Sequence, residues 1–166
     1  MPRSIDRFRA AGPYDGWIGA AVVAMKYHGE RARAAHLGAT LAAPLAQAPR
    51  DAIVVPTPLH PARLRRRGFN QVELIAREAA KHTGHRVEPL LVRVRDTPHQ
   101  VGLDGAARRR NVRDAFAVRE PAKVAGRTVV VVDDVVTTGA TVGACADALR
   151  RAGASAVWAV SLALEG

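Results

Sequence analysis

The chain has 166 residues, of which 48% are hydrophobic, so its length suits one domain with a single sizeable core and its composition excludes a disordered polymer. Its 25 Lys and Arg residues against 15 Asp and Glu give a net charge of +10, which favours phosphate-bearing partners. Cys145 is the single cysteine, so no internal disulfide or cysteine-rich zinc site can form. The sequence also has no apolar run of about 18 residues and no signal-peptide pattern, so we expect a cytoplasmic protein without membrane insertion.

Apolar residues at helical spacing predict an N-terminal helical segment over about residues 14–48, in two pieces that break near residues 27–29. Short β-branched runs predict buried strands, and longer amphipathic stretches between them predict helices. In chain order, these are a strand at 51–56, a helix at 69–84, strands at 89–94, 114–118 and 125–134, a helix at 140–152 and a last strand at 156–164. Because strands alternate with helices, we expect one α/β domain over residues 1–166, with its core at about 51–166 and a central, mostly parallel sheet flanked by helices.

Two predicted loops are rich in arginine. One follows the strand at 51–56, and the other, at 95–113, lacks periodicity and is long enough to be functional or mobile. Together they hold nine of the 25 basic residues, namely Arg63, Arg65, Arg66, Arg67, Arg95, Arg108, Arg109, Arg110 and Arg113. If both loops surround one mouth, this clustering favours capture of a polyanion, although nucleic-acid contact and a merely solvated basic turn are also compatible with it.

The stretch VVVVDDVVTTGAT, residues 129–141, places two acids at the predicted end of a buried strand. Adjacent carboxylates there require a cation or hydrogen-bond donors, and ligands of open α/β sheets bind at the carboxyl ends of strands. The amides of residues 137–141, entering a helix, suit a phosphate, while Asp133 and Asp134 suit sugar hydroxyls or a divalent metal. A phosphorylated ribose with Mg²⁺ satisfies all three features; the alternative is an ordinary helix cap beside solvated acids.

This stretch closely resembles the phosphoribosyl-pyrophosphate (PRPP) motif of type I phosphoribosyltransferases. Three further segments, KYHGER (26–31), VPTPLHPARLRRRGFNQVELIA (55–76) and QVGLDGAARRRNVRDAF (100–116), are similar to the ComF family (ComFC, also GntX-like), which is linked to natural competence. Many members also carry an N-terminal cysteine-rich zinc ribbon, which this sequence lacks. The resemblance implies the type I phosphoribosyltransferase fold.

The resemblance also implies roles for individual residues. Asp133 and Asp134 would be the catalytic pair, holding the ribose 2′ and 3′ hydroxyls directly or through Mg²⁺ and its water. The residues that would bind the 5′ phosphate are Thr137, Thr138, Gly139, Ala140 and Thr141. Those that would bind pyrophosphate are Thr57, Pro58, Leu59, His60 and Arg67, with the amides of Thr57 and Leu59 as donors because proline has none.

Two smaller groups complete the implied site. The loop that would close over the ligand and exclude water contributes Arg95, Gln100, Arg108, Arg110 and Asn111. The remaining motif residues are Lys26, Gly68, Asn70 and Gln71, of which Asn70 is expected either to cap a helix or to touch the ligand.

These observations lead to two functional hypotheses. In the first, the protein transfers phosphoribosyl from Mg²⁺-bound PRPP to an unidentified nitrogen acceptor. In the second, it is a non-catalytic module that binds PRPP and single-stranded DNA and works with DNA-uptake or recombination proteins. The net charge supports the second, whereas an aromatic content of 4% is sparse for stacking single strands.

Overall fold

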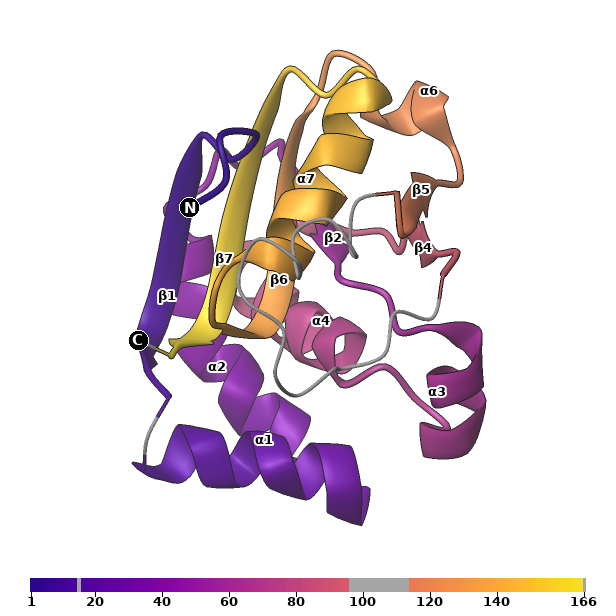
Figure 1. Ribbon diagram of the computed structural model, residues 1–166. Coiled ribbons are helices and arrows are strands. Elements are labelled where there is room, and N and C mark those ends of the chain that lie inside the picture. Colours follow the sequence, from indigo (N-terminus) through magenta and orange to yellow (C-terminus); the bar gives the residue numbers. More distant parts are fainter. Residues whose placement is uncertain (15, 96–113, 166) are drawn as a thin grey trace.

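The computed structural model describes residues 1–14, 16–95 and 114–165 (Figure 1). Its helices are α1 (Gly16–His28), α2 (Arg33–Leu45), α3 (Pro61–Arg67), α4 (Gln71–Thr83), α6 (Pro121–Val124) and α7 (Ala140–Arg151). Its strands are β1 (Arg7–Pro13), β2 (Ile53–Pro56), β3 (Arg86–Val87), β4 (Leu91–Arg93), β5 (Phe116–Val118), β6 (Thr128–Val136) and β7 (Ala156–Leu164). None of the helices in these ranges has the length and hydrophobicity of a membrane span.

Five strands form one sheet in the order β1-β7-β6-β2-β3, and every pairing in it is parallel. The short strands β4 and β5 form a separate antiparallel pair. The prediction of an α/β domain with a mostly parallel sheet flanked by helices is therefore confirmed.

Helices cover both faces of the sheet, and each face has its own core. On one face, Val130 and Val132 of β6 pack in a cluster with residues of α1, α2 and α4. On the other face, Val129 and Val131 pack against α7 and the β4–β5 pair. Figure 1 shows α7 in front of the sheet, α2 and α4 behind it, and α1 across the edge where the parallel strands end. Residues 129–132 of β6 thus face the two layers in turn, as expected of a strand.

Four elements were not predicted from the sequence: β1, α3, β3 and α6. The strand β1 contains two arginines and a glycine, so it lacks an apolar run of its own. It forms because it pairs along its length with the buried strand β7, from Arg7 opposite Trp158 to Pro13 opposite Leu164. The Arg7 guanidinium also lies over the Trp158 ring, 5.2 Å from its centroid.

The strand β6 is longer than expected. Its pairing with β2 stops at Val132, but its pairing with β7 continues to Val136. Asp133 and Asp134 therefore lie inside β6 and not at its end, which corrects the prediction. They do lie just beyond Val132, the last residue of β6 that pairs with β2, so from there on β6 pairs with β7 alone.

The local signals at the helix ends were interpreted correctly. Gly29, with a positive φ of 69°, separates α1 from α2. Asn70 caps α4 by accepting a hydrogen bond from the Val72 amide at 3.0 Å, and Gly84 ends the same helix in the left-handed conformation. These ends place the last turn of α1 and the first turn of α4 at the carboxyl edge of the sheet.

Candidate active site

The two acids of β6 lie on opposite faces of the sheet. Asp134 continues the face of Val130 and Val132, toward α1 and α4, and Asp133 continues the other face, toward α7. Consistent with this, burial raises the pKa of the Cys145 thiol on α7, and the charge of Asp133 raises it further. The two carboxylates therefore meet different neighbours although they are adjacent in sequence.

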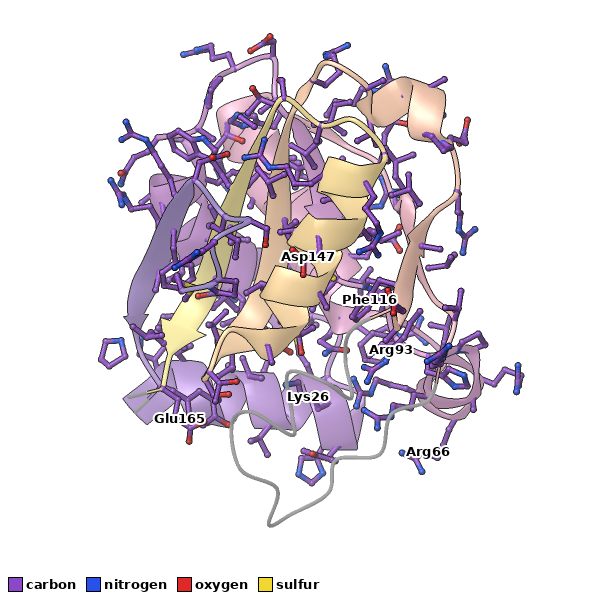
Figure 2. The ribbon with its side chains drawn as sticks, turned by 45° about the horizontal axis from the view of Figure 1, so that its top comes forward. Lys26, Arg66, Arg93, Phe116, Asp147 and Glu165 are labelled. Atoms are coloured by element: carbon purple, nitrogen blue, oxygen red, sulfur yellow. The ribbon has the colours of Figure 1, made fainter. Side chains whose placement is uncertain are left out.

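Asp134 is a buried carboxylate whose charge is compensated. Its Oδ2 atom lies 2.8 Å from the Lys26 Nζ atom of α1 and accepts a hydrogen bond from Gln71 Nε2 of α4 at 2.9 Å, while its Oδ1 atom accepts from the Val135 amide at 2.7 Å. Burial alone would lower the pKa of Lys26, but the charge and hydrogen bond of Asp134 outweigh it, so that pKa is raised. The expectation that a cation or hydrogen-bond donors meet the acids is confirmed for Asp134, whose cation is Lys26 of the protein itself. Figure 2 shows Lys26 at this edge of the molecule.

Asp133 is less enclosed, and one of its oxygens remains open. Its Oδ1 atom accepts hydrogen bonds from Thr57 Oγ1 at 2.9 Å and from the Asp134 amide at 3.0 Å. No residue in the described ranges donates to its Oδ2 atom. Burial, followed by the neighbouring charge of Asp134, raises the pKa of Asp133 to about 7. This carboxyl group therefore has both an open acceptor atom and a proton that it exchanges near neutral pH.

The loop after β2 is held against β6 by its own backbone. The Thr57 amide donates to the Val132 carbonyl at 2.9 Å, so it continues the sheet ladder and is not available to a ligand, contrary to the expectation. The Thr57 carbonyl accepts from Asn70 Nδ2 at 2.9 Å. Asn70 therefore caps α4 and also fixes this loop. The Leu59 amide remains as the predicted donor without a backbone partner in the described chain.

The rest of the predicted pyrophosphate site lies on and around α3. The side chain of His60 caps this helix by accepting from the Ala62 amide at 3.3 Å. Arg67, at the end of α3, donates to Gln71 Oε1 at 2.5 Å, and burial lowers the pKa of its guanidinium. Gln71 thus links Arg67 to Asp134: its amide oxygen accepts a hydrogen bond from the Arg67 guanidinium, and its amide nitrogen donates one to the Asp134 carboxylate. Gly68 ends α3 with a φ of 83° and lets the chain turn back into α4.

The predicted phosphate loop, residues 137–141, connects β6 to α7. Gly139, with a φ of 75°, is the N-cap residue that precedes α7, while Thr137 and Thr138 are exposed. The Thr138 hydroxyl accepts a long hydrogen bond of 3.4 Å from the Ala140 amide. The amides of this helix start have the arrangement that binds anions. Met1 and Pro2 pack beside the loop, where a side chain at Gly139 would lie 3.2 Å from Pro2 Cδ.

One predicted group lies almost wholly outside the described residues. Arg95 follows β4 and is exposed, whereas Gln100, Arg108, Arg110 and Asn111 fall within residues 96–113. Within the described ranges, no three His, Cys, Asp or Glu side chains form a metal-binding group. A Mg²⁺ ion nevertheless suits the site, because such ions commonly bind one or two carboxylates together with phosphate oxygens of the ligand, and Asp133 has an open oxygen.

This geometry is that of a phosphoribosyltransferase-like domain, and comparison with known proteins agrees. The chain belongs to the phosphoribosyl transferase domain family, whose model matches residues 66–165. It is 42% identical over 105 residues to the DNA utilization protein YhgH of Escherichia coli (strain K12), a match covering 63% of this chain and 45% of that protein. It is 32% identical over 112 residues to Competence protein F of Haemophilus influenzae, covering 66% and 49%. The similarity to the ComF family is thus confirmed, and the chain spans about half the length of these relatives.

Solved structures support the same fold. The allosteric regulatory enzyme of purine biosynthesis superposes with a TM-score of 0.52 at 26% identity, over 77% of this chain and 25% of that one. The glutamine PRPP amidotransferase of B. subtilis, complexed with ADP and GMP, gives a TM-score of 0.50 at 25% identity, over 76% and 25%. The type I phosphoribosyltransferase fold expected from the sequence is therefore confirmed.

Proposed function

We propose that this protein binds PRPP with Mg²⁺ at the carboxyl edge of the sheet and transfers its phosphoribosyl group to a nitrogen acceptor. The observation that carries the proposal is the open, half-buried carboxylate of Asp133 between the loops 57–60 and 137–141. Family membership and the PRPP in the name of the B. subtilis amidotransferase support the same ligand.

The contacts divide the two acids between different tasks. Asp133 Oδ2 is available to accept from the ribose hydroxyls, whereas both oxygens of Asp134 already have partners. In this proposal Asp133 contacts the ligand, and Asp134 fixes the positions of Lys26 and Gln71. The amides of residues 137–141 bind the 5′ phosphate, and Leu59 with Arg67 faces the pyrophosphate.

The reaction breaks the bond between the anomeric carbon and the pyrophosphate oxygen and forms a bond from that carbon to the acceptor nitrogen. The proton of that nitrogen passes to solvent water, and pyrophosphate leaves as the anion. Positive charge develops on the ribose in the transition state, and the ionised form of Asp133 stabilises it. The arginines around α3 attract the departing polyanion. A bound Mg²⁺ would supply charge neutralisation on the pyrophosphate oxygens.

A second candidate function is a non-catalytic module that binds PRPP and single-stranded DNA. The observations favouring it are the net charge of +10, the exposed arginines of α3 and the relatives named for DNA utilization and competence. In both candidate functions the protein works in DNA uptake or DNA use. They differ in whether the protein catalyses phosphoribosyl transfer.

Titration calorimetry with PRPP and Mg²⁺ tests the shared part of the proposal. Asp133→Asn should weaken PRPP binding at least tenfold, because a hydrogen bond between hydroxyls and a charged acceptor is lost. Asp147→Asn is the matched control, since Asp147 is an exposed acid on α7 (Figure 2), and it should bind like the wild type. Absence of PRPP binding to the wild type would overturn the proposal.

Pyrophosphate release then separates the two candidates. The wild type is incubated with PRPP, Mg²⁺ and a panel of purine and pyrimidine bases and amines, and released pyrophosphate is measured. Release that depends on one acceptor and is lost in Asp133→Asn establishes a transferase. PRPP binding without release on the whole panel favours the binding module.

A further inference from the structure

Gln71, the first residue of α4, carries a buried amide that lies between two charged groups. Only 3% of this residue is exposed. Its Oε1 atom accepts a hydrogen bond from Arg67 Nη1 at 2.5 Å, and its Nε2 atom donates one to Asp134 Oδ2 at 2.9 Å. A guanidinium has donors only and an ionised carboxylate has acceptors only, so each end of the amide has the partner that its chemistry requires.

This amide keeps Arg67 and Asp134 apart. Asp134 forms its ion pair with Lys26, at 2.8 Å, and within the described ranges no ion pair joins it to Arg67. The two groups still affect each other, because burial lowers the pKa of the Arg67 guanidinium and the charge of Asp134 opposes that change. Gln71 therefore lies where the guanidinium and the carboxylate would otherwise attract each other directly.

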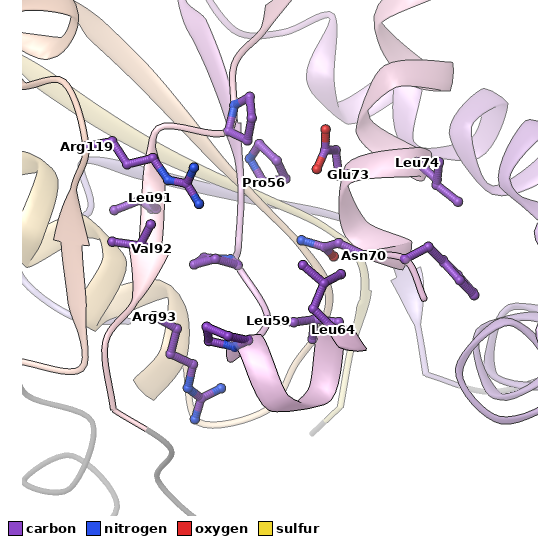
Figure 3. Close-up of a pocket in the computed structure, with 14 residues that line it drawn as sticks. Pro56, Leu59, Leu64, Asn70, Glu73, Leu74, Leu91, Val92, Arg93 and Arg119 are labelled. Carbon is purple, nitrogen blue, oxygen red and sulfur yellow. The ribbon is translucent and has the colours of Figure 1, made fainter. Parts of the chain in front are cut away.

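Packing alone does not fix the position of Arg67. The helix α3 that ends at this residue has no buried residue. It borders a cavity of about 540 Å³, whose wall includes Leu64 of α3 and Asn70, the N-cap of α4 (Figure 3). In the described part of the chain, the bond to Gln71 is the hydrogen bond that the guanidinium makes. Because a long side chain with so few contacts has many rotamers, this bond is what selects one of them.

We propose that Gln71 is a positioning residue of the pyrophosphate site: it holds the Arg67 guanidinium toward the leaving group and prevents its direct pairing with Asp134. This inference rests on the proposed function, because it concerns the pyrophosphate of PRPP. With one N–H group of the guanidinium bound to Gln71, the other donors stay available to pyrophosphate oxygens. Gln71 then determines how strongly the site prefers PRPP to ribose 5-phosphate, which has the same ribose and 5′ phosphate but no pyrophosphate.

Substitutions at this position change Arg67 in two different ways. Methionine has a similar length but no amide, so in Gln71→Met nothing holds the guanidinium away from Asp134. In Gln71→Glu the new carboxylate keeps the shape of the side chain but would pair with Arg67 and repel the pyrophosphate. Both variants should therefore weaken PRPP and spare ribose 5-phosphate, whose contacts in the proposed function are with Asp133 and residues 137–141.

NMR titration of the full chain with PRPP and with ribose 5-phosphate, each with Mg²⁺, tests this proposal. We expect each Gln71 variant to bind PRPP about tenfold more weakly than the wild type and to bind ribose 5-phosphate within about twofold of it. Gln47→Met is the matched control, because Gln47 also accepts a hydrogen bond from an arginine, Arg9 at 2.9 Å, but at an exposed position. This control should bind both ligands like the wild type.

Combining Gln71→Met with Arg67→Met tests whether Gln71 acts through Arg67. If it does, Arg67→Met already removes the whole effect, so the double variant should bind PRPP no more weakly than Arg67→Met alone. A role of Gln71 in general stability would instead weaken ribose 5-phosphate as well, and its loss would add to that of Arg67→Met.

The outcomes separate this inference from the proposed function. Asp133→Asn should weaken PRPP and ribose 5-phosphate alike, because the ribose that Asp133 would contact is common to both. If the wild type binds PRPP and both Gln71 variants keep its preference over ribose 5-phosphate, the inference is overturned and the proposed function stands. Additive losses in the double variant overturn the inference in the same way. Absence of PRPP binding to the wild type overturns both.

Discussion

Replacing Lys26 by methionine should destabilise the protein strongly, because the variant leaves Asp134 buried without its cation. The side chain of Asp134 is 6% exposed and that of Lys26 is 24% exposed. Breaking a buried ion pair by removing one partner costs about 3–5 kcal/mol. We expect the lower end or slightly less, about 2–3 kcal/mol, because Lys26 is not fully buried and Gln71 still donates to the carboxylate.

Urea and thermal unfolding measure this change. For a chain of this length, about 2–3 kcal/mol corresponds to a fall in melting temperature of about 5–10 °C. Lys81→Met is the matched control: Lys81 forms an ion pair with Glu78 at 2.6 Å, but its side chain is 67% exposed, so the expected loss is below about 0.5 kcal/mol.

A double-mutant cycle separates the ion pair from general effects of losing a lysine. Lys26→Met combined with Asp134→Asn removes both charges, so the double variant should be more stable than the sum of the single losses by at least about 1 kcal/mol. Strict additivity, or a Lys26→Met variant as stable as Lys81→Met, would show that this pair does not anchor α1 to the site.

Two further predictions concern the acid that remains open and the packing behind it. Burial and the charge of Asp134 raise the pKa of Asp133 from 3.8 to about 7, so the folded state holds this proton more tightly than the unfolded chain does. The free energy of unfolding should therefore fall as the pH rises from about 4 to 7, by at most about 4 kcal/mol. Urea titrations at several pH values should show that Asp133→Asn removes this component of the pH dependence. Gly38→Ala should lower the free energy of unfolding by about 2–3 kcal/mol, because its Cβ atom would lie 2.3 Å from Glu78 Cβ and 2.9 Å from the Ala79 amide nitrogen, where α2 meets α4. Gly19→Ala is the control. Its Cβ atom would have no neighbour closer than 3.7 Å, so this variant should be neutral or stabilising in the same melts.

Local sequence patterns were sufficient for the elements whose stability is local or fully buried. The helix at α4 has its own cap, apolar face and glycine stop, and the core strands are continuous β-branched runs. The strand β1 was missed because its residues gain their conformation from pairing with β7, about 150 positions later in the chain. The end of β6 was misplaced for the same reason, since β7 extends it past the point where β2 stops.

The candidate site divides in the same way. The sequence indicated which residues gather at the carboxyl edge, because motif and topology place them there. It did not indicate which atoms are already occupied: the Thr57 amide belongs to the sheet ladder, and Lys26 bonds to an acid 108 positions away. Such pairings depend on strand register and on the angle at which α1 crosses the sheet, and neither leaves a local pattern.

The position of the two acids within β6 explains why the chain has two of them. Because side chains alternate along a strand, adjacent carboxylates must face different layers, so one acid is available to each layer. On its side of the sheet, Asp134 forms an ion pair with Lys26 and accepts a hydrogen bond from Gln71, and these contacts fix α1 and α4 at the carboxyl edge of the sheet. Its charge also raises the pKa of Asp133 and so keeps that group near the point where it changes charge. A single acid at either position could supply the anchor or the open carboxylate, but not both, and the pair therefore couples the assembly of the site to the ionisation of the group that would contact the ribose.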